Sequence, residues 1–345
     1  MRAWQVVRHG RPSRALELRD IDIPEPGPRE VLVRTIATVL NYNEVDGCRG
    51  RYLTVDPDLP YTLGMELVGV VERAGAGGES LVGRRVVATA KGAFGAHAEY
   101  VVCPVDMVFD APPMLDDVAA AAFLFPFHLA WLGLFTRGRL LRGQSVLIHA
   151  AAGGVGSAAV QLAVDAGATV IAVAGGPTKA DLCRAAGATA VVDHTSERFE
   201  DVVAEVTGGR GVDLVFDGVG GEVADRSLRC LAFGGTHMAV GFASGIEAEE
   251  VPWVTPRRLC FGSIATAGVM LSYTSFPDAA RAASGFNIAP RALGEEIHAS
   301  LLALLAERRI APVVGGVVAF DDLPDALDAM EDRSTTGRVV VRMES

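Results

Sequence analysis

A glycine-rich run near the middle of the chain has the residue types and spacing of a phosphate-binding turn. The apolar segment Val146–Ala150 leads into it, and a helical pattern over Val155–Ala166 follows. Glycine lets a backbone approach a pyrophosphate, and the helix amino end offers N–H groups and a positive dipole. Since a strand precedes the turn and a helix follows it, we predict a dinucleotide site, with a ligand-free tight turn as the alternative. The candidate residues are Ala152, Gly153, Gly154, Val155 and Gly156.

The end of the next predicted strand bears on which dinucleotide is bound. An acid there would bind the ribose 2′-hydroxyl of NAD, whereas basic groups would accept the 2′-phosphate of NADP. After Thr169–Ala174 no acid is present, and Lys179 lies just downstream, while His194 follows the strand after that. We therefore expect NADPH, with Gly176, Lys179 and His194 among the residues that bind it. A solvated first-turn lysine is the simpler interpretation of Lys179 alone.

The elements that must position these residues alternate between strand and helix from about 123 to 268. Continuous apolar strands separated by helices are typical of a parallel sheet covered on both faces. Six such strands predict an α/β fold of the Rossmann type, a doubly wound parallel sheet. The predicted strands are Val146–Ala150, Thr169–Ala174, Ala190–Val192, Asp213–Phe216, Thr236–Val240 and Cys260–Ala265.

The residues before and after this region do not show the same alternation of strand and helix. Residues 1–122 contain short strand-like runs punctuated by proline and glycine, which indicates an irregular, mostly β domain. Residues 269–345 read as helix and strand but are too few and too mixed for an obvious independent domain. We expect them to pack back on residues 1–122, the first zone. The predicted division is therefore 1–122, 123–268 and 269–345.

Composition excludes several classes of protein. The chain has 345 residues, of which 50% are hydrophobic, so a buried core is expected and global disorder is excluded. Thirty-one basic and 42 acidic residues give a net charge of −11 without a Lys/Arg cluster, which argues against nucleic acid. The five cysteines are far apart and form no C-x-x-C pair, as expected of reduced cytoplasmic thiols.

No membrane partner or targeting segment is expected either. The amino end lacks an apolar h-region, which argues against a signal peptide. Val118–Phe135 is apolar and barely long enough to cross a bilayer, but Pro126 and His128 lie in its middle. A buried helix at a domain junction is the better interpretation.

The glycine turn Ala151–Gly156, taken with Gly211–Gly221, resembles the medium-chain dehydrogenase/reductase superfamily. It looks most like the zinc-free quinone oxidoreductase branch, which includes zeta-crystallin, and the likeness extends to Gly64–Val71, Gly241–Gly245 and Thr336–Val341. The resemblance implies a mostly β, GroES-like catalytic domain built from both chain ends, with the coenzyme domain inserted between. It also implies a cleft that holds NADPH and substrate, and a homodimer or homotetramer. Further coenzyme contacts are implied for Val219, Gly241 and Phe242.

The resemblance allows the zinc ligands of related alcohol dehydrogenases to be checked. Those enzymes use an early cysteine, a Gly-His-Glu and a later cysteine, because zinc needs N and S ligands around an open position. Here Met65 stands in the histidine place, and Asn41–Glu44 replaces the early cysteine segment. We expect no zinc. Without a Lewis acid, the chemistry should suit acceptors already conjugated with a carbonyl, namely quinones and α,β-unsaturated carbonyls.

Asn41 and Tyr52 are the candidate catalytic residues, because Asn41–Tyr52 resembles the active-site stretch of that branch. An amide and a phenol could stabilise a developing enolate, and the phenol could donate a proton. Glu44 replaces the usual aspartate, which puts any role of the shorter acid in doubt. Packing of Tyr52 and a turn role for Asn41 are the simpler alternatives.

Three functions remain open at this level. The first is an NADPH-dependent reductase of quinones or activated alkenes. The second is an enoyl-thioester reductase, for which Arg49 and Arg51 offer thin support as a basic rim. The third is a non-catalytic NADPH-binding protein.

Overall fold

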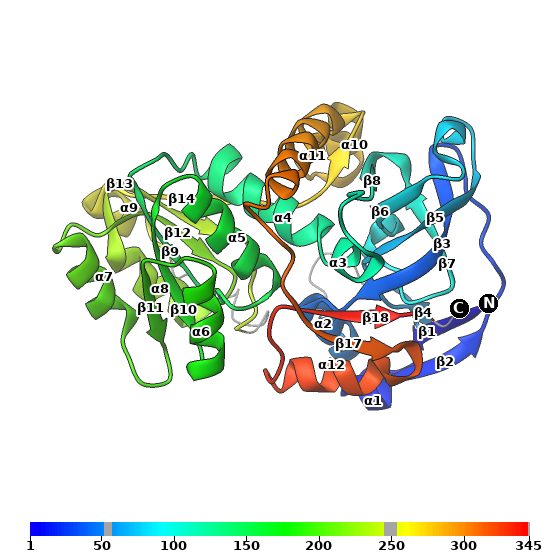
Figure 1. The fold of residues 1–345 in the computed structure, drawn as a ribbon, viewed down its shortest axis with the longest axis horizontal. Helices are drawn as coiled ribbons and strands as arrows, with labels where there is room; N and C mark the ends of the chain where they lie inside the picture. The colour runs from blue at the N-terminus through cyan, green and yellow to red at the C-terminus, as the bar shows by residue number, and fades with distance from the viewer. Residues whose placement is uncertain (52–56, 245–253, 344–345) are drawn as a thin grey trace. The chain divides into compact units, whose positions relative to one another are not determined.

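The computed structural model describes residues 1–51, 57–244 and 254–343 (Figure 1). The chain packs into two compact units, here called the β-rich unit and the doubly wound unit. The β-rich unit comprises Met1–Phe125, Ser272–Ala306 and Pro312–Ser345, and the doubly wound unit comprises Pro126–Leu271 and Glu307–Ala311. Chain segments far apart in sequence thus build the β-rich unit.

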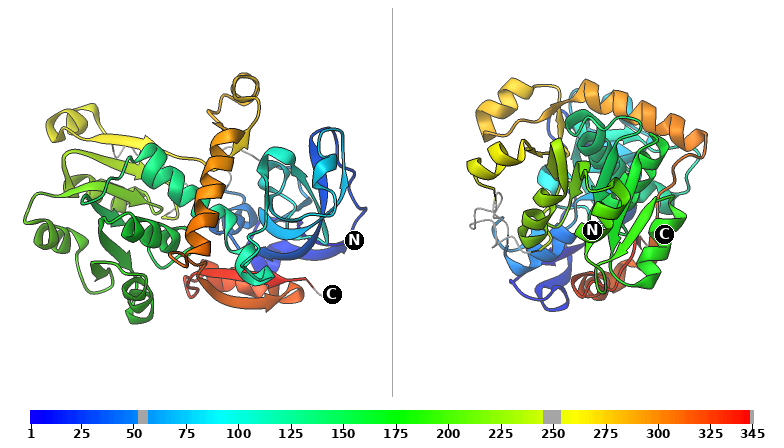
Figure 2. Two further views of the ribbon diagram at one scale, coloured as in Figure 1. Left: turned by 45° about the horizontal axis from the view of Figure 1, so that its top comes forward. Right: turned by 90° about the vertical axis from the view of Figure 1, so that its left-hand side faces the viewer.

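The doubly wound unit is organised around one parallel sheet. Among the described residues this sheet has six strands in the order β11-β10-β9-β12-β13-β14, and helices lie on both of its faces (Figures 1 and 2). The order reverses between β9 and β12, which is where doubly wound sheets bind ligands. The predicted fold is confirmed. Its strands are β9 (Ser145–Ile148), β10 (Thr169–Ala174), β11 (Ala190–Asp193), β12 (Val212–Asp217), β13 (Leu231–Ala239) and β14 (Ala265–Gly268).

The helices of this unit largely follow the predicted pattern, but one predicted strand is wrong. Cys260 was expected in a strand and lies instead in α9 (Pro256–Gly262), while β14 begins at Ala265. The Thr255 side chain caps the amide of Arg258 and Pro256 occupies the first helical turn, and both features favour a helix start. The other helices are α5 (Gly154–Asp165), α6 (Pro177–Ala185), α7 (Phe199–Thr207) and α8 (Gly221–Ser227).

The β-rich unit joins strands from both ends of the chain in one sheet. In the described part, β17, β18, β3, β5, β6 and β8 pair in that order, and β7 pairs with β3. Strand β18 is antiparallel to β3, so the closing segment does pack on the first zone. The bounds are β3 (Glu30–Val39), β5 (Glu66–Ala74), β6 (Arg85–Thr89), β7 (Tyr100–Pro104), β8 (Val108–Asp110), β17 (Val314–Ala319) and β18 (Arg338–Arg342).

Smaller elements complete this unit. A separate sheet has the order β2-β1-β4, and β15 pairs with β16, within the described ranges. The strand bounds are β1 (Arg2–Val6), β2 (Leu16–Asp20), β4 (Tyr61–Thr62), β15 (Tyr273–Thr274) and β16 (Ala289–Pro290). The helices are α1 (Pro12–Ala15), α2 (Tyr42–Arg49), α3 (Asp117–Ala121), α10 (Pro277–Ser284), α11 (Arg291–Ala306) and α12 (Leu323–Glu331), and α4 (Leu124–Trp131) followed by a π-helical turn leads into the other unit.

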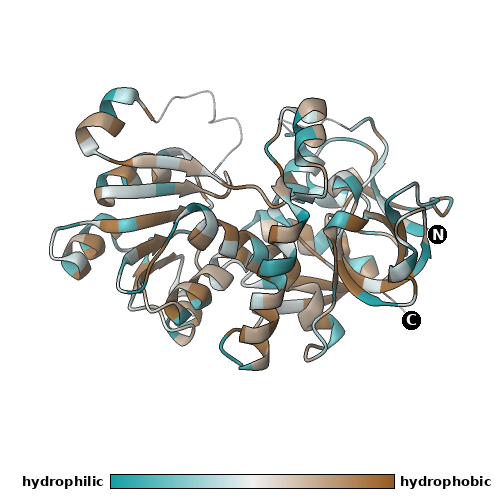
Figure 3. Ribbon diagram, turned by 90° about the horizontal axis from the view of Figure 1, so that it is seen from above, coloured by the Kyte–Doolittle hydropathy of each residue, from teal (hydrophilic) through white to brown (hydrophobic). Residues whose placement is uncertain are grey.

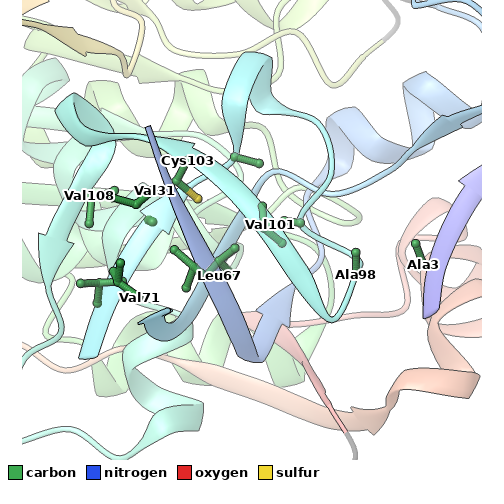
Figure 4. Close-up of a cluster of buried hydrophobic side chains, with 13 residues drawn as sticks. Ala3, Val31, Leu67, Val71, Ala98, Val101, Cys103 and Val108 are labelled. Carbon is green, nitrogen blue, oxygen red and sulfur yellow. The ribbon is translucent and has the colours of Figure 1, made fainter. Parts of the chain in front are cut away.

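Apolar side chains from alternate strand positions form the cores. The β-rich unit has one buried hydrophobic cluster that includes Val31, Leu67, Val101 and Val108 (Figure 4). In the doubly wound unit a separate cluster gathers around Leu147, as expected where helices cover a parallel sheet.

Candidate coenzyme and active-site residues

The turn between β9 and α5 has the geometry expected of a phosphate-binding loop. A Cβ atom on Gly156 would lie 2.2 Å from the carbonyl oxygen of Ala150, so only glycine lets the helix start this close to the strand. Gly153 occupies the N-cap position, and no described side chain caps the helix. The first amides of a helix have no intrahelical partner. The uncapped start of α5 therefore offers N–H donors that suit a pyrophosphate.

A second turn follows β10 and brings Gly175 next to His194. A Cβ atom on Gly175 would lie 2.8 Å from Nε2 of His194, so the imidazole lies directly over this glycine. The amide of Gly176 donates to the carboxylate of Asp193 at 2.9 Å. This bond and those from Thr195 hold the pKa of Asp193 below its ordinary value. Lys179 lies in the first turn of α6, so the structure places three predicted coenzyme residues around one strand end.

Asp193 is an acid near this strand end that the sequence pattern did not identify. It comes from the end of β11, one strand over, and parallel pairing brings it beside the β10 turn. Its carboxylate already accepts bonds from the Gly176 and Thr195 amides and the Thr195 hydroxyl. It therefore serves first to hold the turn.

The remaining predicted coenzyme residues meet at the ends of β12 and β13. The amide of Val240 donates to the carbonyl of Asp217 at 2.8 Å, and the amide of Ser244 donates to the carbonyl of Val219 at 2.8 Å. These bonds join the turn that contains Val219 to the segment that contains Gly241 and Phe242. A Cβ on Gly241 would lie 3.0 Å from the carbonyl oxygen of Gly218, which explains the small residue at that position.

Beneath that turn lies a buried hydrogen-bonded pair, Asp217 and His237, that sequence reasoning missed. His237 Nε2 donates to one carboxylate oxygen of Asp217 at 2.9 Å. The other oxygen accepts from the amides of Val219 and Gly220 at 2.7 and 3.0 Å. Burial raises the pKa of Asp217, but the His237 hydrogen bond, nearby imidazoles and the Val219 amide outweigh it, so the pKa lies below its ordinary value. An aspartate directly before Gly-Val-Gly-Gly was the signal available in the sequence.

A second buried histidine ties α8 to the glycine-turn strand. His149, just after β9, donates from Nε2 to the hydroxyl of Ser227 at 2.7 Å, and that hydroxyl donates to the carbonyl of Val223. Burial lowers the pKa of His149 to about 4. The imidazole is therefore neutral near pH 7 and acts as a structural donor.

Asn41, the predicted catalytic amide, belongs to the β-rich unit and is only 5% exposed. It precedes α2, and its Oδ1 accepts from Nη1 of Arg338 at 3.0 Å. Its Nδ2 lies 3.4 Å from the carbonyl oxygen of Val39 and 3.5 Å from the Glu44 carboxylate. The amide is thus engaged within the unit. Tyr52, the other predicted catalytic residue, lies outside the described residues.

A network of buried polar groups surrounds Met65 and Glu66, the segment compared above with the zinc-binding Gly-His-Glu. Glu44 accepts from Nε2 of His97 at 3.0 Å and from the Met65 amide at 3.2 Å. Glu66 pairs with Arg338 and accepts from the Phe125 amide. Burial raises the pKa of Glu66, and the Arg338 charge offsets part of this.

These residues do not fit zinc. The two carboxylates and the imidazole are used in bonds to one another, to Arg338 and to backbone amides. Across residues 1–51, 57–244 and 254–343, no three His, Cys, Asp or Glu side chains are grouped as metal ligands. Over the same ranges, no helix has both the length and the apolar character needed to cross a bilayer.

Comparison with known protein families finds a match in each of the two units. Residues 27–113 match the family described as "Alcohol dehydrogenase GroES-like domain", and residues 154–285 match "Zinc-binding dehydrogenase". The name of the second family mentions zinc, but the buried polar residues described above do not fit zinc. The match to residues 154–285 therefore supports the fold of this domain and not a metal site.

Three relatives show the range of similar proteins. A "Quinone oxidoreductase-like protein 2 homolog" from Nematostella vectensis is 30% identical over 91% of this chain and 82% of its own length. A mycocerosic acid synthase-like polyketide synthase from Mycobacterium tuberculosis is 37% identical over 71% of this chain, which spans 12% of that protein. The Escherichia coli quinone oxidoreductase, solved with NADPH, has a TM-score of 0.86 at 27% identity, over 99% of this chain and 100% of that one. The chain therefore belongs to the medium-chain dehydrogenase/reductase superfamily, and it is similar over almost its whole length to quinone oxidoreductases of that superfamily.

Proposed function

We propose that this chain is an NADPH-dependent oxidoreductase that reduces a quinone or an α,β-unsaturated carbonyl without a metal. The observation that carries the proposal is the uncapped start of α5 after a turn in which Gly156 meets the Ala150 carbonyl without room for a side chain. Similarity to an E. coli enzyme solved with NADPH supports the coenzyme.

The residues at the strand ends fit a dinucleotide as follows. Gly153, Gly154 and Gly156 would hold the pyrophosphate at the start of α5. Lys179 and His194 would bind the 2′-phosphate beside Gly176. Val219, Gly241 and Phe242 would contact the nicotinamide half. When bound, NADPH would supply the hydride.

The β-rich unit would supply the groups that act on the substrate. We propose Tyr52 as the hydrogen-bond donor to the substrate carbonyl and as the proton donor to the enolate. We propose that Asn41 also acts on the substrate, with its amide oriented by Arg338. The domain boundaries at 122/123 and 268/269 remain our proposal for where the catalytic and coenzyme domains divide.

Reduction of an enoyl thioester is the second candidate, favoured by the similarity to a polyketide synthase. A basic rim for a carrier phosphate would support it. However, Arg49 pairs with Glu331 at 2.7 Å and Arg51 with Asp46 at 3.1 Å. Both arginines are thus engaged within the chain, which favours the first candidate.

An acceptor panel tests these functions. Purified protein would be mixed with NADPH or NADH and a simple quinone, an α,β-unsaturated ketone or an enoyl-CoA, and loss of nicotinamide absorbance followed. Faster NADPH consumption with the quinone or ketone supports the proposal, and consumption with enoyl-CoA alone supports the second candidate. Tight NADPH binding without turnover would indicate a non-catalytic binding protein. Equal rates with NADH would contradict the coenzyme assignment.

We also propose a cytoplasmic homodimer or homotetramer joined through the doubly wound units. Strand β14 ends the sheet order, and two phenylalanines near that edge, Phe233 and Phe261, are 90% and 87% exposed. Helix α9, at the upper left of Figure 3, carries hydrophobic as well as hydrophilic residues. An open sheet edge beside exposed aromatic side chains suits pairing with a second copy.

A further inference from the structure

The Asp217–His237 pair has a location that a stability role alone does not explain. Asp217 is 1% exposed and ends β12, and His237 lies on the neighbouring strand β13, where it pairs in register with Val215. Apolar side chains fill most interior positions of such a sheet. A buried carboxylate and its hydrogen-bond partner often contribute no more stability than apolar residues of the same volume. The hydrogen bonds that the pair makes to its neighbours therefore have to explain why it is there.

The pair is hydrogen-bonded to the turn that follows β12. The carboxylate uses one oxygen for His237 and the other for the amides of Val219 and Gly220. An ionised carboxylate accepts only, so His237 carries its proton on Nε2. His237 thus fixes the carboxylate, and the carboxylate fixes two successive amides of the turn.

The same turn is bonded to the segment after β13. The carbonyls of Asp217, Gly218 and Val219 accept from the amides of Val240, Ala243 and Ser244 at 2.8, 3.3 and 2.8 Å. A change in the path of the turn would therefore move Gly241 and Phe242 as well. These are the residues proposed above for the nicotinamide half.

We propose that Asp217 and His237 are positioning residues that hold the nicotinamide-binding turns in their binding geometry before the coenzyme arrives. The inference rests on the proposed dinucleotide function. A site that is already ordered loses less conformational freedom on binding. When the binding geometry is only partly populated, apparent affinity falls by that fraction. The adenosine half, near β10 and β11, should not depend on this pair.

Two substitutions at His237 and one control test the inference. H237L removes the donor and leaves a buried carboxylate short of one partner. H237Q keeps an amide N–H that can reach the carboxylate. The control is H298L, because His298 is also a buried histidine but bonds to the carbonyl of Asp110 in the β-rich unit. Binding would be followed by fluorescence titration with NADPH and, separately, with adenosine 2′,5′-bisphosphate.

H237L should weaken NADPH binding about tenfold, because the turn would then hold its binding geometry in only about a tenth of the molecules. Its affinity for adenosine 2′,5′-bisphosphate should stay at the wild-type value, which a general loss of structure would not allow. H237Q should recover most of the NADPH affinity, and H298L should match wild type.

Unchanged NADPH affinity in H237L overturns the inference, and so does equal loss for both ligands in a folded variant. Failure of the wild-type protein to bind NADPH would instead overturn the proposed function. The two failures are therefore distinguishable.

Discussion

Glu44 and His97 form a hydrogen-bonded pair in the interior of the β-rich unit, with Nε2 of His97 3.0 Å from the Glu44 carboxylate. His97 is fully buried, and its Nδ1 lies 3.2 Å from the Thr38 hydroxyl. That hydroxyl donates to the carbonyl of Glu66. The pair thus links the start of α2 to strands β3 and β5.

Glu44→Ala should lower the free energy of unfolding by about 3 kcal/mol, because His97 and two backbone amides lose a buried acceptor. Urea denaturation measures this. The control is Glu25→Ala, whose carboxylate is 74% exposed and pairs with Arg73. That change should cost about 0.5 kcal/mol or less. Equal losses in the two variants would contradict a structural role for the buried pair.

Gly156→Ala should abolish coenzyme binding and lower thermal stability. Its Cβ would lie 2.2 Å from the Ala150 carbonyl oxygen and 2.7 Å from the Ala151 Cα, so α5 would have to shift away from β9. Gly153→Ala is the matched control, because its Cβ would meet only the Ala150 oxygen, at 3.3 Å. NADPH titration and thermal unfolding should show the larger loss for Gly156→Ala. Wild-type NADPH affinity in Gly156→Ala would show that this turn does not bind the pyrophosphate.

Lys179→Ala should weaken NADPH binding about tenfold and leave NADH binding unchanged, since only NADPH carries the 2′-phosphate. Arg184→Ala is the control on the same helix, because its guanidinium pairs with Asp181 on the exposed face. That variant should bind both coenzymes as the wild type does. If Lys179→Ala weakened both coenzymes alike, the lysine would not be the phosphate ligand.

Asp213 should make a pH-dependent contribution to stability. Hydrogen bonds from Arg210, with further bonds from Ser145, outweigh burial and lower its pKa to about 2. A depressed carboxyl pKa stabilises the fold above the unfolded-state value of about 3.9, and that stabilisation is lost as pH falls toward 2.

At pH 6, Asp213→Asn should therefore be less stable than wild type by about 1–2 kcal/mol in urea denaturation. The difference should shrink between about pH 4 and pH 2, as the wild-type carboxyl gains its proton. A difference that stayed constant over that interval would contradict the assigned cause.

Phe261→Glu should shift the protein toward a smaller species in size-exclusion chromatography with light scattering, because it places charge on the proposed subunit contact. Phe276→Glu is the control, since Phe276 is also exposed but belongs to the β-rich unit. That variant should elute as wild type. A monomeric wild-type protein would remove the proposed contact.

Local sequence patterns were enough to predict the doubly wound fold and its glycine turn. Apolar runs such as Thr169–Ala174 become parallel strands because most positions of a sheet covered on both faces are buried. The turn through Gly156 is equally local, since strand, glycine and helix start adjoin in the chain. The strand predicted at Cys260 was wrong because an apolar run alone does not distinguish strand from helix, whereas the Thr255 cap and Pro256 do.

Which buried polar groups contact one another depends instead on how distant segments pack together. Asp217 and His237 are 20 residues apart, Glu44 and His97 are 53 apart, and Asn41 and Arg338 are 297 apart. No local pattern encodes such pairs, because parallel crossovers and the return of β18 to β3 bring them together. A buried charge must find a partner wherever the fold places one, and that partner is fixed by strand order and register rather than by its neighbours in sequence.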